Sequence, residues 1–412
     1  MTVNTLPSVS FPTSAVLSFT PSYNNHNLVL TANRIPLSTI NKIPALKGIS
    51  EELELIRGST SESQFDNLLF LLDQQSTVQG VEKILLNLLP DEVNGGLFQS
   101  SMLSQNLVLN QIIHRADMLR AGVDQFKRTG YAAGDLSEGQ MSYGPIVFGN
   151  SAKQQPLGGI SGYASNTAGF GFIGDTPISS FVRVGAGLSY ANTLVKVGNS
   201  GGSTTTIANV QGTLYSSANY GPLFLDGMVS YGVNHYKGKR NIQLFGETAS
   251  ANYQSGQYGG RARAGFSIPM YTVEVAPLGY VQYTHLNRSR YQEKGAPGFN
   301  LAVESHQIVG TQFGMGFRVT EVSQSEEFLP ELHVMFINDV RSPDLIVTSQ
   351  FVDGGGAFVS QGPKPPKAGV NIGMSITALM HEDFLLVGGY DYETKKGFNS
   401  HSASVKFKWL FF

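Results

Sequence analysis

The chain contains no cysteine, a single tryptophan and few charged residues. Its 412 residues include 28 Lys and Arg and 30 Asp and Glu, so charged side chains make up only 14% of the sequence. Without cysteine, neither a disulfide framework nor a thiolate metal site is possible. The net charge of -2 gives no electrostatic attraction for nucleic acid, and we set that class of partner aside.

Long apolar runs are also missing. No stretch approaches 18 consecutive apolar residues, which excludes a transmembrane helix. If so weakly charged a chain spans a bilayer, only a closed β-barrel satisfies its backbone hydrogen bonds. The segment from Met1 to Phe19 lacks a basic start, and prolines interrupt its apolar residues. It is no signal peptide, and we expect an export signal upstream of Met1.

Two motifs of common enzymes are missing as well. The sequence contains no His-Glu-x-x-His helix and no Gly-x-x-x-x-Gly-Lys phosphate loop. Histidines and aspartates occur in the C-terminal part, but their spacing singles out no catalytic dyad. We therefore expect no enzymatic activity, no metal site and no cofactor.

Three regions precede the C-terminal part. Residues 1–48 are rich in Ser, Thr, Asn and Pro and hold short β-type runs around Leu17 and Leu30, which predicts the end of a β-structured region. In residues 49–100, Leu, Ile and Phe recur at three-to-four spacing, which predicts a small helical cluster. Residues 101–141 hold a last helix, from about Ser101 to Thr129, and a glycine-containing connector.

The last helix is too polar for contact with lipid and suits a water-accessible lumen. We assign Asn110, Arg115 and Arg120 to its polar face. A charge in a confined lumen needs a partner, and inward carboxylates such as Asp226 or Glu274 would supply one for the arginines. A solvated helix face is the alternative.

From Ser142 onward, apolar residues alternate with small or polar ones. Between Val182 and Tyr190 the even-numbered residues are apolar, whereas the odd-numbered ones are Arg, Gly or Ser. The same period of two returns from Phe313 to Thr320 and from Val370 to Ala378. A soluble sandwich carries strong charge on its outer face. An outer-membrane barrel instead has lipid outside and a polar interior, which fits these segments better.

Such segments recur about twelve times, and an even number is typical of single-chain bacterial barrels. Turns alternate in length, because Tyr220-Gly221-Pro222 is tight whereas the segment from Gly354 to Lys367 is long. We predict a mostly β fold, with a twelve-stranded antiparallel transmembrane β-barrel over residues 142–412 around a lumenal α-helix. Its strands are expected near 142–150, 163–176, 179–197, 203–220, 222–242, 248–268, 270–292, 301–321, 326–349, 364–381, 382–397 and 398–412.

Several motifs resemble those of the autotransporter family of Gram-negative bacteria. They occur in the family's order and cover nearly the whole chain. The segment from Tyr23 to Arg34 resembles the closing rung of a passenger β-helix, and residues 61–89 resemble the short helical region that follows it. The helix that ends with residues 115–120 is similar to the linker helix in the family's barrel lumen. Residues 351–376, with three consecutive glycines, match a motif before the family's last strands.

The last strand resembles the family's barrel-assembly signal. Val405, Phe407, Trp409 and Phe411 alternate, and the chain ends on Phe412. This stripe is one residue out of register with Phe412, so either final Phe is a candidate for the signal terminus. The Asn-Asn self-cleavage pair of the family is absent from the lumenal helix, so the resemblance does not fix whether the passenger is cleaved.

The resemblance implies an outer-membrane translocator domain of type V secretion that carries its own N-terminal passenger to the cell surface. It implies four partners: outer-membrane lipids, the barrel-assembly machinery, periplasmic chaperones and the passenger itself. Two alternatives stay open. A simple outer-membrane pore or surface-adhesin barrel predicts no helix in the lumen, and a soluble β-rich enzyme predicts expression without detergent.

Overall fold

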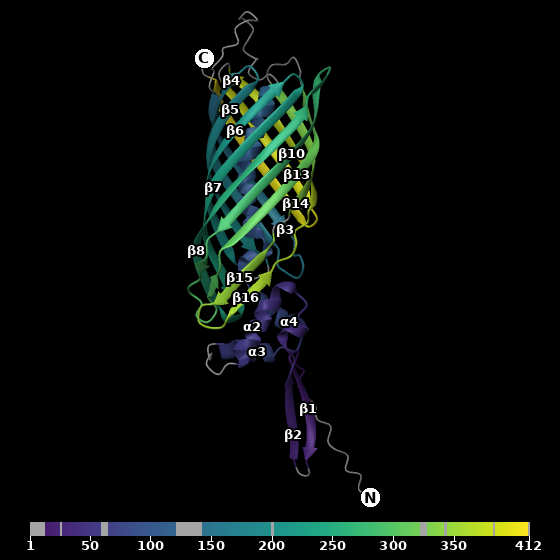
Figure 1. The fold of residues 1–412 in the computed structure, drawn as a ribbon, viewed down its shortest axis with the longest axis vertical. Helices are drawn as coiled ribbons and strands as arrows, with labels where there is room; N and C mark the ends of the chain where they lie inside the picture. The colour runs from purple at the N-terminus through teal and green to yellow at the C-terminus, as the bar shows by residue number, and fades with distance from the viewer. Residues whose placement is uncertain are drawn as a thin grey trace, which may run out of the picture.

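The computed structural model describes residues 13–24, 27–58, 65–120, 142–198, 202–321, 328–341, 344–381 and 384–410. Figure 1 shows a β-barrel with a helix running through its lumen, a group of short helices at one end, and a hairpin that projects beyond these helices. No helix within the described residues combines the length and the apolarity needed to cross a bilayer.

The barrel consists of twelve antiparallel strands. The last strand, β19, pairs with both β18 and the first barrel strand, β3, and this pairing closes the barrel. A three-residue strand, β9 (Ile268–Met270), only extends the edge of β10. The twelve-stranded barrel predicted from the alternation is confirmed. Its strands are β3 (Ser142–Gln154), β4 (Tyr163–Ser179), β5 (Val182–Val197), β6 (Thr204–Tyr220), β7 (Leu223–Ile242), β8 (Glu247–Phe266), β10 (Val273–Arg288), β13 (His306–Glu321), β14 (Phe328–Arg341), β17 (Ala368–His381), β18 (Phe384–Lys395) and β19 (Phe398–Leu410).

The two faces of the barrel wall differ as the alternation requires. On β5, Leu188 is 63% exposed, whereas the adjacent Ser189 is buried on the inner side. On β13, Phe313 and Phe317 are exposed, whereas Arg318 is buried. Apolar side chains thus form the outer surface and polar ones the lining, which is the arrangement of a barrel with lipid outside.

The two ends of the barrel also differ. At one end the connections are short, as at the two residues between Tyr220 and Leu223. At the other end, two connections carry strands of their own: β11 (Tyr291–Gln292) with β12 (Leu301–Val303), and β15 (Ile346–Phe351) with β16 (Ala357–Gln361). These four form a separate sheet in the order β11-β12-β15-β16, which we call the rim sheet.

The rim sheet corrects part of the strand prediction. Residues 326–349 were expected to form one strand, but β14 ends at Arg341 and residues 346–351 belong to β15. Likewise β10 ends at Arg288 and β13 begins at His306, so both are shorter than expected. Alternation continues across these breaks because a sheet at the rim also has two unlike faces, and a period of two does not report which sheet a strand joins.

Short helices pack on the rim sheet and form what we call the cap. They are α1 (Leu37–Ile40), η1 (Pro44–Leu46), α2 (Lys47–Gly58), α3 (Asp66–Asp73) and α4 (Val78–Leu88). One apolar core joins both parts, and the rings of Phe65 and Phe351 meet at 5.1 Å. On α2, the carboxylate of Glu52 accepts the backbone N–H of Gly356 in the rim sheet. Here Gly48 has no room for a side chain, because a Cβ would lie 2.3 Å from the carbonyl oxygen of Val359.

The hairpin of β1 (Leu17–Asn24) and β2 (Asn27–Arg34) extends from the cap away from the barrel (Figure 1). All residues of β2 are exposed, including the apolar Leu28, Val29 and Leu30. Only its base is anchored, where Arg34 pairs with Asp73 of α3 at 2.6 Å.

A short 3-10 turn, η3 (Asp91–Asn94), connects the cap to the lumenal helix, and we call it the neck. It ends at Gly95, whose φ of +75° lies in the left-handed region that glycine tolerates. One ion pair holds the neck to the barrel wall: Arg288 of β10 meets Glu92 at 2.9 Å. Nearby, Arg240 of β7 pairs with Glu293, which follows β11, at 2.6 Å.

Asp91 is a third carboxylate in this region. Burial raises the pKa of Asp91 to about 7; the guanidinium of Arg240 opposes the rise and the carboxylate of Glu293 adds to it. The ordinary value is 3.8, so the folded neck binds a proton that the unfolded chain has already released. Folding stability must therefore fall as the pH rises between these two values.

We expect the neck to be better protected at pH 5 than at pH 8, because charging Asp91 opposes its burial. Asp91→Asn should remove most of this difference, whereas Glu51→Gln, at an exposed acid of α2, should leave it unchanged. Hydrogen exchange of residues 88–96, normalised to intrinsic rates, measures the effect. An Asp91→Asn protein with the full pH dependence would contradict the assignment.

Candidate functional site

The lumen of the barrel is occupied by α5 (Gly96–Arg120). Its polar and apolar residues follow one another around the whole helix, so it has no single apolar face. Nearly every described residue of α5 from Leu97 to Asp117 is buried or half-buried. The helix begins five residues before the predicted Ser101, and the predicted extension over residues 121–129 lies outside the described residues.

Apolar contacts hold α5 at two levels. Near the neck, Leu97 packs against Tyr163 and Tyr236 of the wall. A Cβ on Gly96 would lie 2.8 Å from the ring of Tyr163, so glycine permits close approach of the helix here. Midway along the lumen, a larger cluster joins one side of the helix to five neighbouring strands. Its members are Leu107, Val108, Leu109, Ile112, Ile146, Phe148, Ile173, Ala191, Tyr215 and Met228.

The polar side chains of α5 from Gln105 to Asn110 form hydrogen bonds with side chains of the barrel wall. Gln105 donates to the hydroxyl of Ser230 at 2.7 Å, and its carbonyl oxygen accepts from Gln257 at 3.1 Å. Further along, the side-chain oxygen of Asn110 accepts from Arg261 at 2.8 Å. These contacts come from β7 and β8, so the helix is hydrogen-bonded to one part of the barrel wall.

Arg115 makes a two-pronged ion pair with Asp175 of β4. The Nε and Nη2 atoms of Arg115 lie 2.9 and 3.1 Å from the two carboxylate oxygens, and both side chains are only 2% exposed. The same carboxylate accepts from Arg183 at 2.7 Å and from the hydroxyl of Tyr215 at 3.0 Å. The partner of Arg115 is thus Asp175, and neither Asp226 nor Glu274 takes that role.

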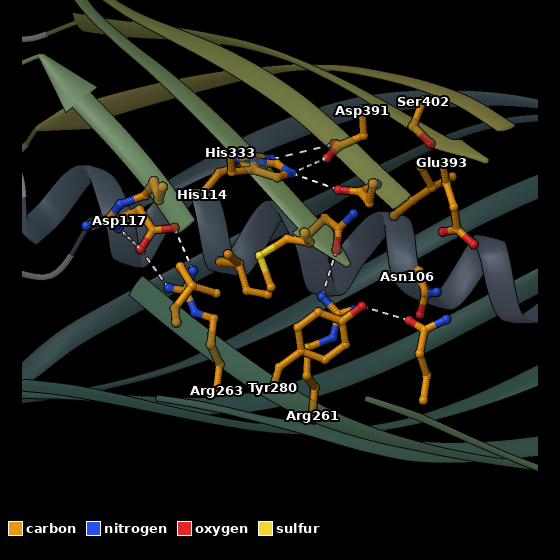
Figure 2. A pocket seen from close by; sticks show the side chains of 18 of the residues that line it. Asn106, His114, Asp117, Arg261, Arg263, Tyr280, His333, Asp391, Glu393 and Ser402 are labelled. Atoms are coloured by element: carbon orange, nitrogen blue, oxygen red, sulfur yellow. Dashed lines mark hydrogen bonds and ion pairs between the residues drawn. The ribbon is translucent and has the colours of Figure 1, made fainter. Parts of the chain in front are cut away.

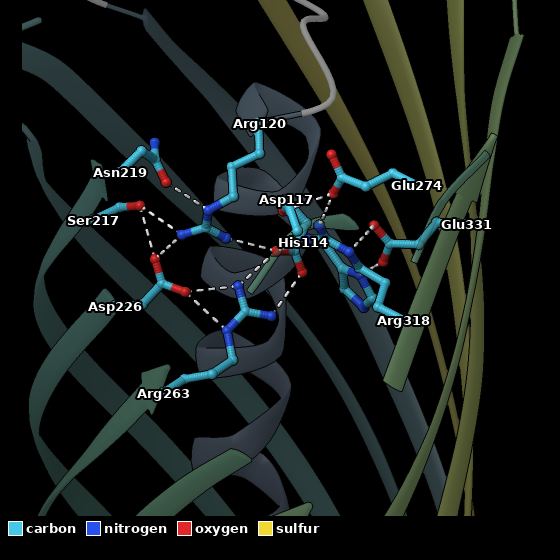
Figure 3. A network of polar contacts seen from close by, with 11 residues as sticks. His114, Asp117, Arg120, Ser217, Asn219, Asp226, Arg263, Glu274, Arg318 and Glu331 are labelled. Carbon is cyan, nitrogen blue, oxygen red and sulfur yellow. Dashed lines mark hydrogen bonds and ion pairs between the residues drawn. The ribbon is translucent and has the colours of Figure 1, made fainter. Parts of the chain in front are cut away.

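Asp117 is the centre of the largest ion cluster (Figure 3). Arg263 of β8 donates to both of its oxygens, at 2.6 and 2.7 Å. Arg318 of β13 contacts the same carboxylate and also meets Glu274 at 2.7 Å. One helix carboxylate therefore binds arginines from two separate strands of the wall.

Arg120 completes this cluster at the end of the helix. It pairs with Asp117 at 2.7 Å and with Asp226 of β7, and it donates to Asn219 at 2.7 Å. Of the two carboxylates proposed from the sequence, Asp226 is thus the partner of Arg120, whereas Glu274 pairs with Arg318. Arg318 also lies 4.0 Å from Glu331, so four carboxylates face three guanidiniums in this cluster. The ring of Phe224 lies within 6 Å of all three arginines, at 4.2, 5.2 and 5.7 Å from their guanidinium carbons.

Beside this cluster, His114 faces a small cavity of about 80 Å³ that Asp117, Arg263 and Arg318 also line (Figure 2). Its ring nitrogens lie 3.6 Å from Glu331 and 3.7 Å from Asp391, and Asp391 also meets His333 at 3.2 Å. In the part of the chain that the structure describes, no group of three such side chains has the geometry of a metal site. The cavity has room for several water molecules beside the helix.

The residues predicted as an assembly signal lie on β19, where the barrel closes. Val405 is 40% exposed and pairs with Val147 of β3. In the backbone register, Trp409 pairs with Tyr143 of β3. Phe407 lies between them and is half-buried, whereas Phe411 and Phe412 lie outside the described residues.

Sequence reasoning missed Asp117, Asp175, Arg263 and Arg318, which make most of the charged contacts with the helix. A signal existed for two of them. Arg263 on β8 and Arg318 on β13 occupy inward positions of strands that alternate clearly, and Arg263 is the cross-strand partner of Asp226. Counting charges at inward positions would have found them, but the rotation of the helix in the lumen cannot be read from a one-dimensional pattern.

We expect Asp117→Ala to destabilise the helix in the lumen by about 3–5 kcal/mol, because it leaves buried guanidiniums without their shared carboxylate. Gln111→Ala, which removes one neutral hydrogen bond of 2.7 Å to Ser404, should cost only about 1 kcal/mol. Thermal unfolding of the detergent-solubilised protein compares the two. Equal losses would show that the ion cluster adds nothing beyond ordinary packing.

Comparisons with known proteins agree with this architecture. The chain is 24% identical to outer membrane protein B of Rickettsia prowazekii, over 93% of this chain and 25% of that protein. It is also 24% identical to outer membrane protein A of Rickettsia conorii, over 92% of this chain and 19% of that protein. The chain therefore spans about a quarter or less of the length of these curated relatives.

A solved structure has the same fold. The translocator domain of the autotransporter NalP from Neisseria meningitidis matches with a TM-score of 0.60 at 13% identity, over 78% of this chain and all of that one. A family model described as the autotransporter beta-domain matches residues 147–391, which is more than half of the chain. The chain belongs to the autotransporter β-domain family.

Proposed function

We propose that this chain moves its own N-terminal passenger across the outer membrane and then retains α5 in the lumen as a plug. The observation that carries the proposal is the continuous path from the exposed hairpin through the cap and the neck to the ion-paired helix. The barrel is an outer-membrane translocator domain, in keeping with its family. The passenger would end within residues 1–48, and residues 49–100 and 101–141 would form the linker and the plug.

The ion pairs between α5 and the wall support a plug that stays in place. An empty pore would leave Arg263, Arg318 and Asp175 lining an open channel, where water would solvate them. With the helix present, each has a partner on α5. A simple pore or surface-adhesin barrel, the rival function, would give no role to a helix whose charged side chains pair with those of the lumen lining.

Four partners follow from this function. The apolar outer band contacts outer-membrane lipids, and the passenger is linked covalently to the barrel. We further propose that periplasmic chaperones and the barrel-assembly machinery deliver and insert the chain. They would recognise the strand that holds Val405, Phe407 and Trp409, together with Phe411 and Phe412, which follow it in the sequence. We assign no catalytic activity to the barrel, and the passenger's own activity lies outside what this chain encodes.

A surface-display experiment tests the function. An export signal and an epitope are placed ahead of residue 13, and the protein is produced in a Gram-negative host. We expect proteinase K to remove the epitope from intact cells while the barrel stays folded in the outer membrane. An outer-membrane barrel whose epitope remains protected until the cells are broken would overturn the proposal.

The plug has its own test. Removal of residues 101–130 should raise single-channel conductance in planar bilayers severalfold, because α5 fills most of the lumen. A matched variant with Gln111→Ala should keep the low conductance of the parent. If the deletion leaves conductance unchanged, the barrel is a simple pore and the plug assignment is wrong.

The assembly signal is tested at its two final residues. Phe411→Ser should reduce the amount of folded barrel in the outer membrane more than Phe412→Ser if the stripe through Val405 and Trp409 is what is recognised. The opposite order would assign recognition to the terminal residue. Heat-modifiability on gels separates folded from unfolded protein, and equal folded amounts in both variants and the parent would count against a signal here.

A further inference from the structure

The outer surface of the barrel carries a cluster of lysines on one side, near the cap. Lys153, Lys196, Lys237 and Lys239 are all exposed and lie on β3, β5 and β7 (Figure 1). Each lies within five residues of the end of its strand at the cap, where Ile242 of β7 joins the cap core. We call these four residues the lysine row.

The register aligns the lysine row across neighbouring strands. Lys153 pairs with Ala164, which pairs with Lys196, and Lys196 pairs with Thr204, which pairs with Lys239. Alternate strands are about 10 Å apart, so these lysines stand at regular intervals with only small side chains between them. Lys237 lies two residues from Lys239 on the same face, about 7 Å along the strand.

Charge is segregated by face in this wall. The described carboxylates of β3 to β8 are Asp175, Asp226 and Glu247, and all occupy inward positions. The arginines of these strands are also inward, whereas the outward cations are all lysines. The lysine row therefore has no acidic side chain on its own face of these strands. It presents four positive charges outward without compensation.

The lysine row begins where the apolar band stops. On β5, Leu194 lies two residues before Lys196 on the same face, about 7 Å along the strand. On β7, Val233 lies four residues before Lys237, about 13 Å along the strand. If the apolar band is in hydrocarbon, the lysines reach the level of the headgroups, where long cationic side chains are favourable.

Strands β10 and β13 lack this feature. The corresponding outward residues on β10 and β13 are Asn287 and Gln307, which pair with each other and carry no charge. Other exposed cations at this end, such as Arg290 and Lys367, lie in loops, whereas the lysine row lies on the outward faces of adjoining strands at regular spacing. This regular arrangement indicates a local partner.

We propose that the lysine row binds the phosphorylated headgroups of lipids in the outer leaflet. Regularly spaced ammonium groups at headgroup level are complementary to phosphates, and each cation near an anionic membrane surface adds to the attraction. The threonines of β6 at positions 204 and 206 offer hydroxyls between the lysines to the same phosphate oxygens. The long connections at the cap end place this end outside, because outer-membrane barrels have short turns on the periplasmic side. The inference therefore uses only the membrane placement of the barrel and is independent of whether a passenger is transported.

The proposal is tested by lipid binding to the full chain in detergent, followed by native mass spectrometry. The probe is diphosphorylated lipid A, compared with the same glycolipid after removal of its phosphates. We expect the parent to retain the phosphorylated form at least about tenfold better. The variant with Gln at positions 153, 196, 237 and 239 should lose this preference, because the cations are gone and the outward positions tolerate the change.

A matched control separates a local site from net charge. It carries Gln in place of Arg290, Lys294, Lys364 and Lys367, four exposed cations in the loops at the same end. The control should bind like the parent. An equal loss in both variants, or equal binding of the dephosphorylated glycolipid, would overturn the proposal. Full competition by millimolar inorganic phosphate would overturn the lipid assignment and indicate a free-anion site. Heat-modifiability on gels confirms that every variant is folded.

Discussion

The cost of placing charge in a confined lumen governs this structure. Each buried ion loses several kcal/mol of hydration unless a partner with good geometry replaces the water. Between α5 and the wall, Asp117, Asp226 and Glu274 pair with Arg120, Arg263 and Arg318, while Asp175 pairs with Arg115 and Arg183. Such pairs add little net stability compared with apolar packing, but they make every other rotation or register of the helix costly. They therefore specify how the helix is seated more than how tightly it is held.

The cap and the lumenal helix are coupled through the neck. Gly95 turns the chain from the cap into the barrel, and Asn94 accepts the backbone N–H of Gly96 at 2.7 Å to start the helix. The rim sheet is built from the loops of the barrel itself, yet it shares one apolar core with α2 and α4. The cap is thus supported by the connections between the barrel strands.

How far the sequence predicts this structure depends on the kind of signal. A period of two repeated over long strands predicts the barrel, since lipid and lumen impose opposite demands on adjacent residues. The pairing of Arg120 with Asp226 was also predictable, because a lumenal cation requires an inward anion. The rim sheet could not be predicted, because the residues from Ile346 to Phe351 alternate like those of any barrel strand. The role of Asp117 depends on the rotation of α5, which no linear pattern records.

The closure of β19 on β3 has a topological consequence. The helix enters the lumen from the cap, and its chain continues into the wall that surrounds it. The closed barrel therefore encircles the helix as a ring. Once the cap has folded, its core of packed helices cannot pass through a lumen that a single helix fills. The cap then acts as a stopper at that end, as in an interlocked molecule. The helix could leave the lumen only if the cap unfolded or the pairing of two barrel strands opened. Retention of the helix therefore depends on kinetics as well as on affinity.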